Sequence, residues 1–162
     1  MSLDAVLLDT QYSEPVKTYC TAKAGLACGL PAIVSQGTAS ATATAGFIVA
    51  ASPARASKTG ILMYNTTPQA PAVPFQGGVL CVTPSGLRRA GPAGSGGTPG
   101  LCDGVFTIDM NTFAQGLWPQ PSNTPAPFLK TPGTQVNGQW WGRDSVATGS
   151  FLSNALEYVV QP

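Results

Sequence analysis

Glycine and proline recur along the whole chain and divide it into short segments. Together they make up about a fifth of the 162 residues, with 19 glycines and 15 prolines. Because both are poorly accepted inside a helix, long helices are excluded over most of the sequence. The short apolar runs between these breaks are typical of an all-β domain with many turns.

Several of these segments favour strands. Residues 37–45 alternate small apolar and hydroxyl side chains, which is the period of two expected of a strand. The Gly-rich residues 90–100 are predicted to be a flexible linker, and residues 110–117 to form one short helical turn. Further strands are expected over residues 46–51, 60–65, 79–82, 104–109, 134–141 and 151–160.

A length of 162 residues is enough for one domain with a hydrophobic core and too short for two ordinary ones. We predict a single antiparallel β-sandwich of about seven to nine strands over residues 19–162, Ig-like or jelly-roll-like, with long Gly/Pro-rich loops. Residues 1–18 precede it as an N-terminal arm. The arm carries Val6, Leu7 and Leu8, and it either binds a partner or lies on its own domain as a first edge strand.

The run from Gln139 to Asp144 combines two of the three tryptophans with an arginine and an aspartate. Trp140 and Trp141 are neighbours on a predicted strand, so their side chains must point to opposite faces. We expect one ring to fill the core and the other to be partly outside, beneath a loop such as residues 118–132. Alternatively, the outer ring is a platform for a sugar or a partner subunit.

Arg143 is predicted to take part in a structural ion pair or to hold a loop through backbone carbonyls. Asp144 is the best candidate for a catalytic acid. Asp103 and Asp109 lie six residues apart on one predicted strand, which separates them by about 20 Å, too far for a glycosidase pair. The chain has no histidine, so Ser-His-Asp and Cys-His mechanisms are excluded. We therefore predict no enzymatic activity, no cofactor and no metal site, with a hydrolase acting through Asp144 as the least favoured alternative.

Charge is scarce in this chain. Charged residues make up 9% of it and the net charge is +1, which leaves no basic field for nucleic acid or an anionic membrane. No apolar stretch approaches the length needed to span a bilayer. Low charge with many small polar residues indicates a surface that is soluble through hydroxyl groups, or one covered by neighbours in an assembly.

The four cysteines, Cys20, Cys28, Cys81 and Cys102, lack the close spacing of a zinc ribbon. Two disulfides and an oxidising destination are therefore expected. The spacing of Cys20 and Cys28 suits a small closed loop, and Cys102 would link the end of the Gly-rich segment back to Cys81. The N-terminus has acids where a signal peptide would be basic, so we expect release by a route such as lysis, or a replaced signal.

Six short motifs follow one another along the chain, at residues 19–23, 46–49, 60–65, 74–82, 139–144 and 152–158. Taken in this order, they resemble a module found near the C-termini of secreted planctomycete and myxobacterial proteins. The resemblance covers residues 19–162 and implies an extracellular, non-enzymatic β-module. The family pattern has a cysteine before the Gln-Trp-Trp run and another in a terminal Cys-Pro, where this chain has Gly138 and Gln161. That double loss makes Cys20–Cys28 and Cys81–Cys102 the simplest pairing, with the other two connectivities open.

The scarce charge, the paired cysteines and the lack of a catalytic set favour a structural role. We expect a structural or display protein attached to a large assembly, such as a bacteriophage capsid decoration or accessory virion protein, at the virion surface or otherwise extracellular. Its partners would be a capsid or other surface lattice and further copies of itself, with no nucleic acid and no membrane insertion. The alternative is a secreted adhesion or carbohydrate-binding module whose partner is a glycan.

Overall fold

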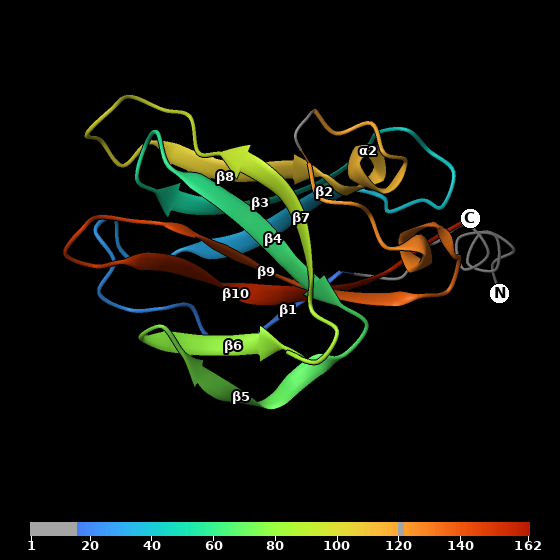
Figure 1. Ribbon diagram of the computed structural model, residues 1–162, viewed down its shortest axis with the longest axis horizontal. Helices are drawn as coiled ribbons and strands as arrows, with labels where there is room; N and C mark the ends of the chain where they lie inside the picture. Colours follow the sequence, from blue (N-terminus) through green and yellow to red (C-terminus); the bar gives the residue numbers. More distant parts are fainter. Residues whose placement is uncertain (1–15, 120–121) are drawn as a thin grey trace, which may run out of the picture.

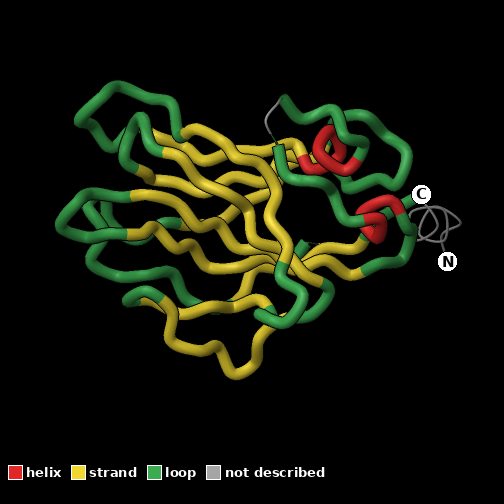
Figure 2. Tube along the Cα trace, in the orientation of Figure 1, coloured by secondary structure: helices red, strands yellow, loops and turns green. Residues whose placement is uncertain are grey.

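The computed structural model describes residues 16–119 and 122–162, which form an antiparallel β-sandwich with almost no helix (Figure 1, Figure 2). One sheet has the strand order β1-β10-β9-β4-β7, the opposite sheet has the order β2-β3-β8, and β5 and β6 form a separate hairpin. The strands are β1 (Lys17–Tyr19), β2 (Ala32–Gly37), β3 (Phe47–Ala54), β4 (Thr59–Asn65), β5 (Pro68–Phe75), β6 (Gly78–Val82), β7 (Arg88–Gly94), β8 (Gly104–Asp109), β9 (Gln135–Arg143) and β10 (Ser150–Val159). The helices are α2 (Met110–Ala114) and a 3-10 turn (Pro127–Lys130).

The all-β sandwich is thus confirmed, and so is the single helical turn after residue 110. The described residues contain ten strands, more than the seven to nine predicted. The relation to Ig-like or jelly-roll domains stays a prediction. Among the described residues, no helix has the length and apolar content needed to cross a membrane.

The main core lies between the five-stranded and three-stranded sheets. On β8, Phe106 and Ile108 point inward and are fully buried, whereas Val105 is exposed, as a period of two predicts. Trp140 of β9 is also fully buried and stacks on Phe106 with ring centroids 5.6 Å apart. Phe151 of β10 packs edge-on against the same phenylalanine at 5.0 Å. The prediction that one of the two tryptophans fills the core is confirmed.

The β5–β6 hairpin covers the outer face of the five-stranded sheet (Figure 1). The half-buried Trp141 points to this face, where it packs with Phe75 of the hairpin around Leu80 and Leu152. The two adjacent tryptophans therefore serve two different apolar clusters, one on each side of the same sheet.

A buried glutamine joins the hairpin to the sheet. Gln139 of β9 is fully buried, and its side-chain oxygen accepts a hydrogen bond from the N–H of Cys81 at 2.9 Å. Its side-chain nitrogen donates to the carbonyls of Val79 at 2.9 Å and Ser153 at 2.8 Å. The amide thus gives β6 the donor and acceptor that a neighbouring strand would supply.

The Pro-rich segment 118–132 does not cover the outer tryptophan as predicted. In its described part, Ala126 and Leu129 are buried in the main core. The N–H of Ala126 donates to the hydroxyl of Tyr64 at 3.0 Å. The β5–β6 hairpin covers Trp141 instead. The prediction missed this because the sequence does not show that a strand pair so rich in proline can lie on a sheet.

Residues 37–45 are not the predicted strand. β2 ends where this segment begins, and the chain then loops around the side chain of Asn111. The Asn111 oxygen accepts from the N–H of Ser40 at 2.9 Å, and its nitrogen donates to the carbonyls of Thr38 and Ala45 at 3.0 and 3.2 Å. Alanine and threonine methyl groups offer little apolar area, so side-chain hydrogen bonds set this backbone in place of sheet pairing.

The Gly-rich segment 90–100 is not a linker throughout. Its first part belongs to β7, where Ala90 lies opposite Leu62 of β4. Ala90 and Ala93 are buried, since their small side chains fit under the facing sheet. β7 is the edge strand of its sheet, a place where Pro92 can lack an N–H without loss of a ladder bond.

The four cysteines form two disulfides, but the expected pairing of neighbours in sequence is wrong. The bonds are Cys20–Cys81 and Cys28–Cys102, with Cα atoms 6.2 and 5.4 Å apart. Cys20 follows β1 at the edge of the sheet that β6 covers, whereas Cys28 and Cys102 meet on two loops. The spacing of cysteines in the sequence gives only the length of chain between them, whereas the pairing follows from how the hairpin and the loops pack on the sheets. Each bond closes a long loop, which the chain-entropy model values at about 4 kcal/mol.

The predicted arm residues Val6, Leu7 and Leu8 lie outside the described residues. The domain boundary predicted after residue 18 falls inside β1, because Lys17 already pairs with Glu157 of β10. The two disulfides and the absence of a free cysteine among the described residues are compatible with an extracellular or secreted protein.

Two glycines make room for the ring of Phe106. Gly60 and Gly142 are register partners on β4 and β9, and a Cβ atom on Gly142 would lie 2.7 Å from that ring. We expect Gly142→Ala to lower the free energy of unfolding by about 1–3 kcal/mol, because the ring must leave its position. Chemical denaturation measures the loss.

The matched control is Gly138→Ala on the same strand, whose Cβ would meet Leu62 at 3.4 Å. This variant should lose less than about 1 kcal/mol of unfolding free energy. Combining Gly142→Ala with Phe106→Leu should cost less than the sum of the two changes, since the smaller side chain relieves the contact. Equal losses for the two alanine variants would contradict this account.

Candidate functional site

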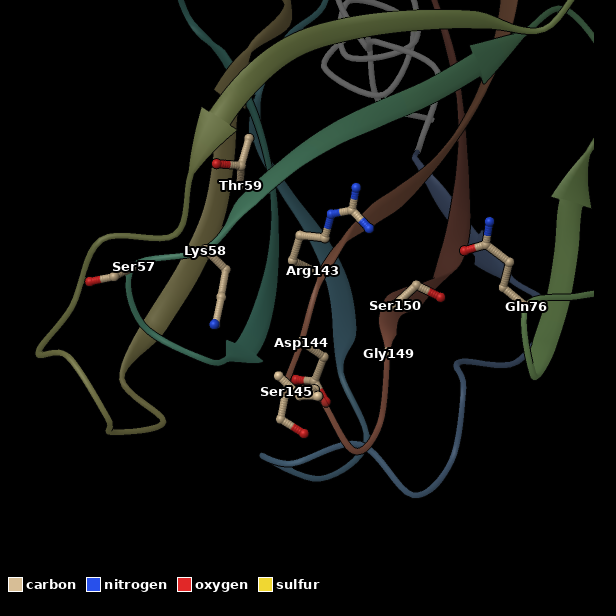
Figure 3. A pocket seen from close by; sticks show the side chains of 10 residues that line it. Ser57, Lys58, Thr59, Gln76, Arg143, Asp144, Ser145, Gly149 and Ser150 are labelled. Carbon is tan, nitrogen blue, oxygen red and sulfur yellow. The ribbon is translucent and has the colours of Figure 1, made fainter.

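A cleft of about 500 Å³ opens where three turns come together (Figure 3). These are the turns between β3 and β4, between β5 and β6, and between β9 and β10. Most of its lining residues carry hydroxyl, amide or charged side chains. The lining residues are Ser57, Lys58, Thr59, Gln76, Arg143, Asp144, Ser145, Val146, Gly149 and Ser150.

The β3–β4 turn brings Lys58 to the cleft. Its N–H donates to the hydroxyl of Ser95 at 2.9 Å, and its carbonyl accepts from the Ser95 N–H at 2.8 Å. The buried Ser95 also donates its hydroxyl to the carbonyl of Arg55 at 2.6 Å. Ser95 alone therefore fixes the backbone of Lys58 through three hydrogen bonds to this turn.

The β9–β10 turn contributes Asp144, the predicted candidate acid. Its side chain is buried, and one carboxylate oxygen accepts from the N–H of Ala27 at 2.9 Å and from the hydroxyl of Thr148. The other oxygen is buried and has no hydrogen-bond partner among the described residues. The Asp144 N–H donates to the Gly149 carbonyl at 2.8 Å. Asp144 therefore holds its own turn against the loop that carries Cys28.

Arg143 and Trp141 form one unit at the rim of the cleft. The guanidinium carbon of Arg143 lies 5.1 Å from the centroid of the Trp141 ring, a cation–π contact. The Trp141 indole N–H donates to the side-chain oxygen of Gln76 at 2.7 Å. For Arg143, this contact takes the place of the ion pair or carbonyl contacts that the sequence suggested.

A second hollow of about 260 Å³ lies over the other side of Trp141. It is mainly apolar and runs between the outer face of the sheet and the hairpin. Gln76 borders both this groove and the cleft, so the two hollows adjoin. The groove is lined by Ile61, Met63, Phe75, Gln76, Leu87, Arg89 and Trp141.

The tight turn of the β5–β6 hairpin places Gln76. Gln76 and Gly77 both have positive φ angles, +46° and +81°, as two-residue hairpin turns require. Lys23 passes next to this turn, close to Gly77, and its ammonium donates to the carbonyls of Thr148 and Ser150 at 3.0 and 2.9 Å. Lys23 thus ties its own segment to the β9–β10 turn while passing beside the hairpin turn.

The other described carboxylates also bind neighbouring groups of the fold. Asp109 accepts hydrogen bonds from the N–H groups of Gly46, Phe47, Asn111 and Thr112. Burial raises the pKa of Asp109, but these bonds outweigh it and hold the pKa below its usual value. A hydrogen bond from the Thr98 N–H likewise lowers the pKa of Asp103. Glu157 accepts from the side chains of Gln135 and Asn137.

The structure separates the predicted site residues. Trp140 is a core residue, whereas Trp141, Arg143 and Asp144 lie at or beside the cleft. Sequence reasoning missed Lys58, Gln76 and Lys23. The Gln-Gly-Gly run was a signal for the hairpin turn, but nothing local indicated that Lys58 reaches the same cleft.

The described residues contain no group of three or more His, Cys, Asp or Glu side chains that could hold a metal ion. No protein-family model, curated protein or solved structure matches the chain. The resemblance to the module of secreted planctomycete and myxobacterial proteins stays a prediction. Function is therefore inferred from the geometry of the site and the fold.

Replacing Asp144 should reveal its structural role. We expect Asp144→Ala to lower the free energy of unfolding by about 1–3 kcal/mol, since the Ala27 N–H loses its acceptor. Val146→Ala in the same turn is the control, because Val146 is fully exposed. The free energy of unfolding of this variant should change by no more than about 0.5 kcal/mol. Thermal or urea unfolding measures both. An Asp144→Ala protein as stable as the control would show that the carboxylate does not hold the turn.

Proposed function

We propose that this chain is a non-enzymatic structural module of an extracellular assembly. The observation that carries the proposal is how its described carboxylates are used. Asp103, Asp109 and Asp144 each accept hydrogen bonds from backbone N–H groups, and Glu157 binds two amide side chains. Carboxylates that accept such hydrogen bonds stabilise the fold, which favours a structural role for them over a role as catalytic acids or bases.

Within this proposal, the assembly is a surface lattice, and the chain decorates it as an accessory protein of a bacteriophage particle. Two features support attachment to neighbours. Only 9% of the residues are charged, which lowers the desolvation cost of covering the surface. Two disulfides join distant segments, which suits a protein that must persist outside a reducing compartment.

Particle association tests this function. Particles released from the producing cells should carry the chain at a fixed ratio to the lattice protein through a density gradient, as measured by mass spectrometry. A variant lacking residues 1–15, which keeps β1 intact, should bind the particles more weakly. If the full chain is recovered only as a free monomer and deletion changes nothing, the assembly proposal fails.

A second candidate function is a secreted adhesion or carbohydrate-binding module. It is favoured by the half-buried Trp141, which borders an apolar groove beside a polar cleft. Ligand sites of this kind combine an aromatic surface with a few polar groups that fix orientation.

A glycan array distinguishes the second function from the first. The oxidised protein should bind at least one glycan saturably, and Trp141→Ala should abolish that binding because the aromatic surface is gone. Val34→Ala serves as the control, since Val34 is an exposed apolar residue on β2 of the other sheet, away from the groove. Circular dichroism must show that both variants remain folded. A folded Trp141→Ala protein with unchanged glycan binding would exclude this use of the tryptophan.

A further inference from the structure

We propose that the cleft and the adjoining groove bind an acidic carbohydrate, meaning a sugar ring that carries a carboxylate or sulfate group. The inference rests on the second of the two proposed functions and names its ligand class. The site consists of Lys58 and Arg143 in the cleft, Gln76 at the junction and Trp141 in the groove.

Three cationic side chains line the two adjoining hollows. They are Lys58 and Arg143 in the cleft and Arg89 in the groove. The one carboxylate that lines the cleft, Asp144, is buried and holds Ala27. Positive charge therefore exceeds negative charge along this lining, which favours an anionic ligand.

Lys58 and Arg143 are the two cationic residues that line the cleft. Lys58 comes from the β3–β4 turn and Arg143 is the last residue of β9, so two separate parts of the chain bring positive charge to the same opening (Figure 3). The structure shows no hydrogen bond or ion pair within the described residues for either side-chain cation, apart from the contact of Arg143 with the Trp141 ring. A guanidinium can meet a carboxylate or sulfate through two parallel hydrogen bonds, and an ammonium adds a third donor.

The neutral groups of the site suit a sugar. Ser57 and Thr59 are exposed residues of the cleft lining, and hydroxyl groups can exchange hydrogen bonds with ring hydroxyls. The indole N–H of Trp141 already binds Gln76, so the part of the ring that borders the groove offers apolar surface. The apolar face of a pyranose fits such a surface, with its acidic group directed toward Arg143.

The site is formed before any ligand arrives. Ser95 fixes the backbone of Lys58, Asp144 fixes the β9–β10 turn, and Gln76 holds the indole. The loop that carries Ala27 is tied down by the Cys28–Cys102 disulfide. A ligand therefore meets groups whose positions are already set, which reduces the ordering cost of binding.

An acidic peptide fits this surface less well. Extended peptides commonly bind by pairing with a free strand edge. Strand β9, which carries Trp141 and Arg143, and its neighbour β4 each have a partner on both sides in the five-stranded sheet. These two strands offer no free edge, so their contacts with a ligand come from side chains, which suits a sugar ring better than an extended backbone.

Binding to four polymers tests the proposal: polygalacturonate, dextran sulfate, neutral dextran and poly-L-glutamate. The immobilised, oxidised protein should bind polygalacturonate or dextran sulfate at least about tenfold more tightly than neutral dextran. Which of the two acidic polymers binds identifies the carboxylate or the sulfate as the recognised group. The affinity should fall as salt is raised, because the contact is ionic.

Charge-removing variants locate the site. Lys58→Gln combined with Arg143→Gln should weaken binding of the acidic polymer about tenfold or more. Lys130→Gln, which removes one positive charge at the 3-10 turn and so matches Lys58→Gln alone, should leave binding unchanged. Lys58→Gln alone should give a smaller loss, and it remains informative if the double variant does not fold. Melting temperatures within a few degrees of the parent protein establish that the variants are folded.

Each remaining outcome has one meaning. Binding of neutral dextran that equals the acidic polymers and ignores the double variant overturns the acidic ligand but leaves glycan adhesion standing. Failure to bind any glycan, on these polymers and on the array, overturns both. Binding of poly-L-glutamate as tight as that of the best acidic polymer shows that charge alone is recognised, which also overturns the proposal.

Discussion

The buried side-chain amide of Gln139 is the interaction on which the outer half of this structure depends. It reaches from β9 to the backbone of Cys81 and Val79 on β6, and a third bond goes to Ser153 of β10. Each of these backbone groups would cost about 1–3 kcal/mol if buried without a partner. Because the amide satisfies them, a second layer can lie on a sheet whose other face already covers the core. That second layer brings Gln76 to Trp141 and so forms one wall of the site.

The sequence predicted the parts of the fold that depend on local periodicity. Local periodicity predicted a strand over residues 104–109 and put Trp140 and Trp141 on opposite faces. It failed where long-range hydrogen bonds decide the backbone, as for residues 37–45 around Asn111. It also failed for the disulfide pairing, because the packing of the β5–β6 hairpin on the five-stranded sheet brings Cys81 to Cys20.

The candidate site was likewise predictable only where its residues are close together in sequence. Arg143, Asp144 and Trp141 lie close together in sequence, so the run that contains them was singled out. Lys58 and Gln76 come from turns far away along the chain, and only the folded backbone shows that they meet. The roles within the run were also not local properties. Asp144 became structural because Ala27 presents an N–H to it, and Arg143 faces the cleft because Trp141 lies beneath it.

The two disulfides interleave along the chain, because Cys28 lies inside the span closed by Cys20 and Cys81 while Cys102 lies outside it. A protease that cuts one peptide bond anywhere between Cys20 and Cys102 therefore leaves two pieces that are still joined by at least one disulfide. With neighbouring cysteines paired, a cut between Cys28 and Cys81 would have released two separate fragments. Where proteases are abundant, this chain outlasts its first cut in that span as one covalent molecule.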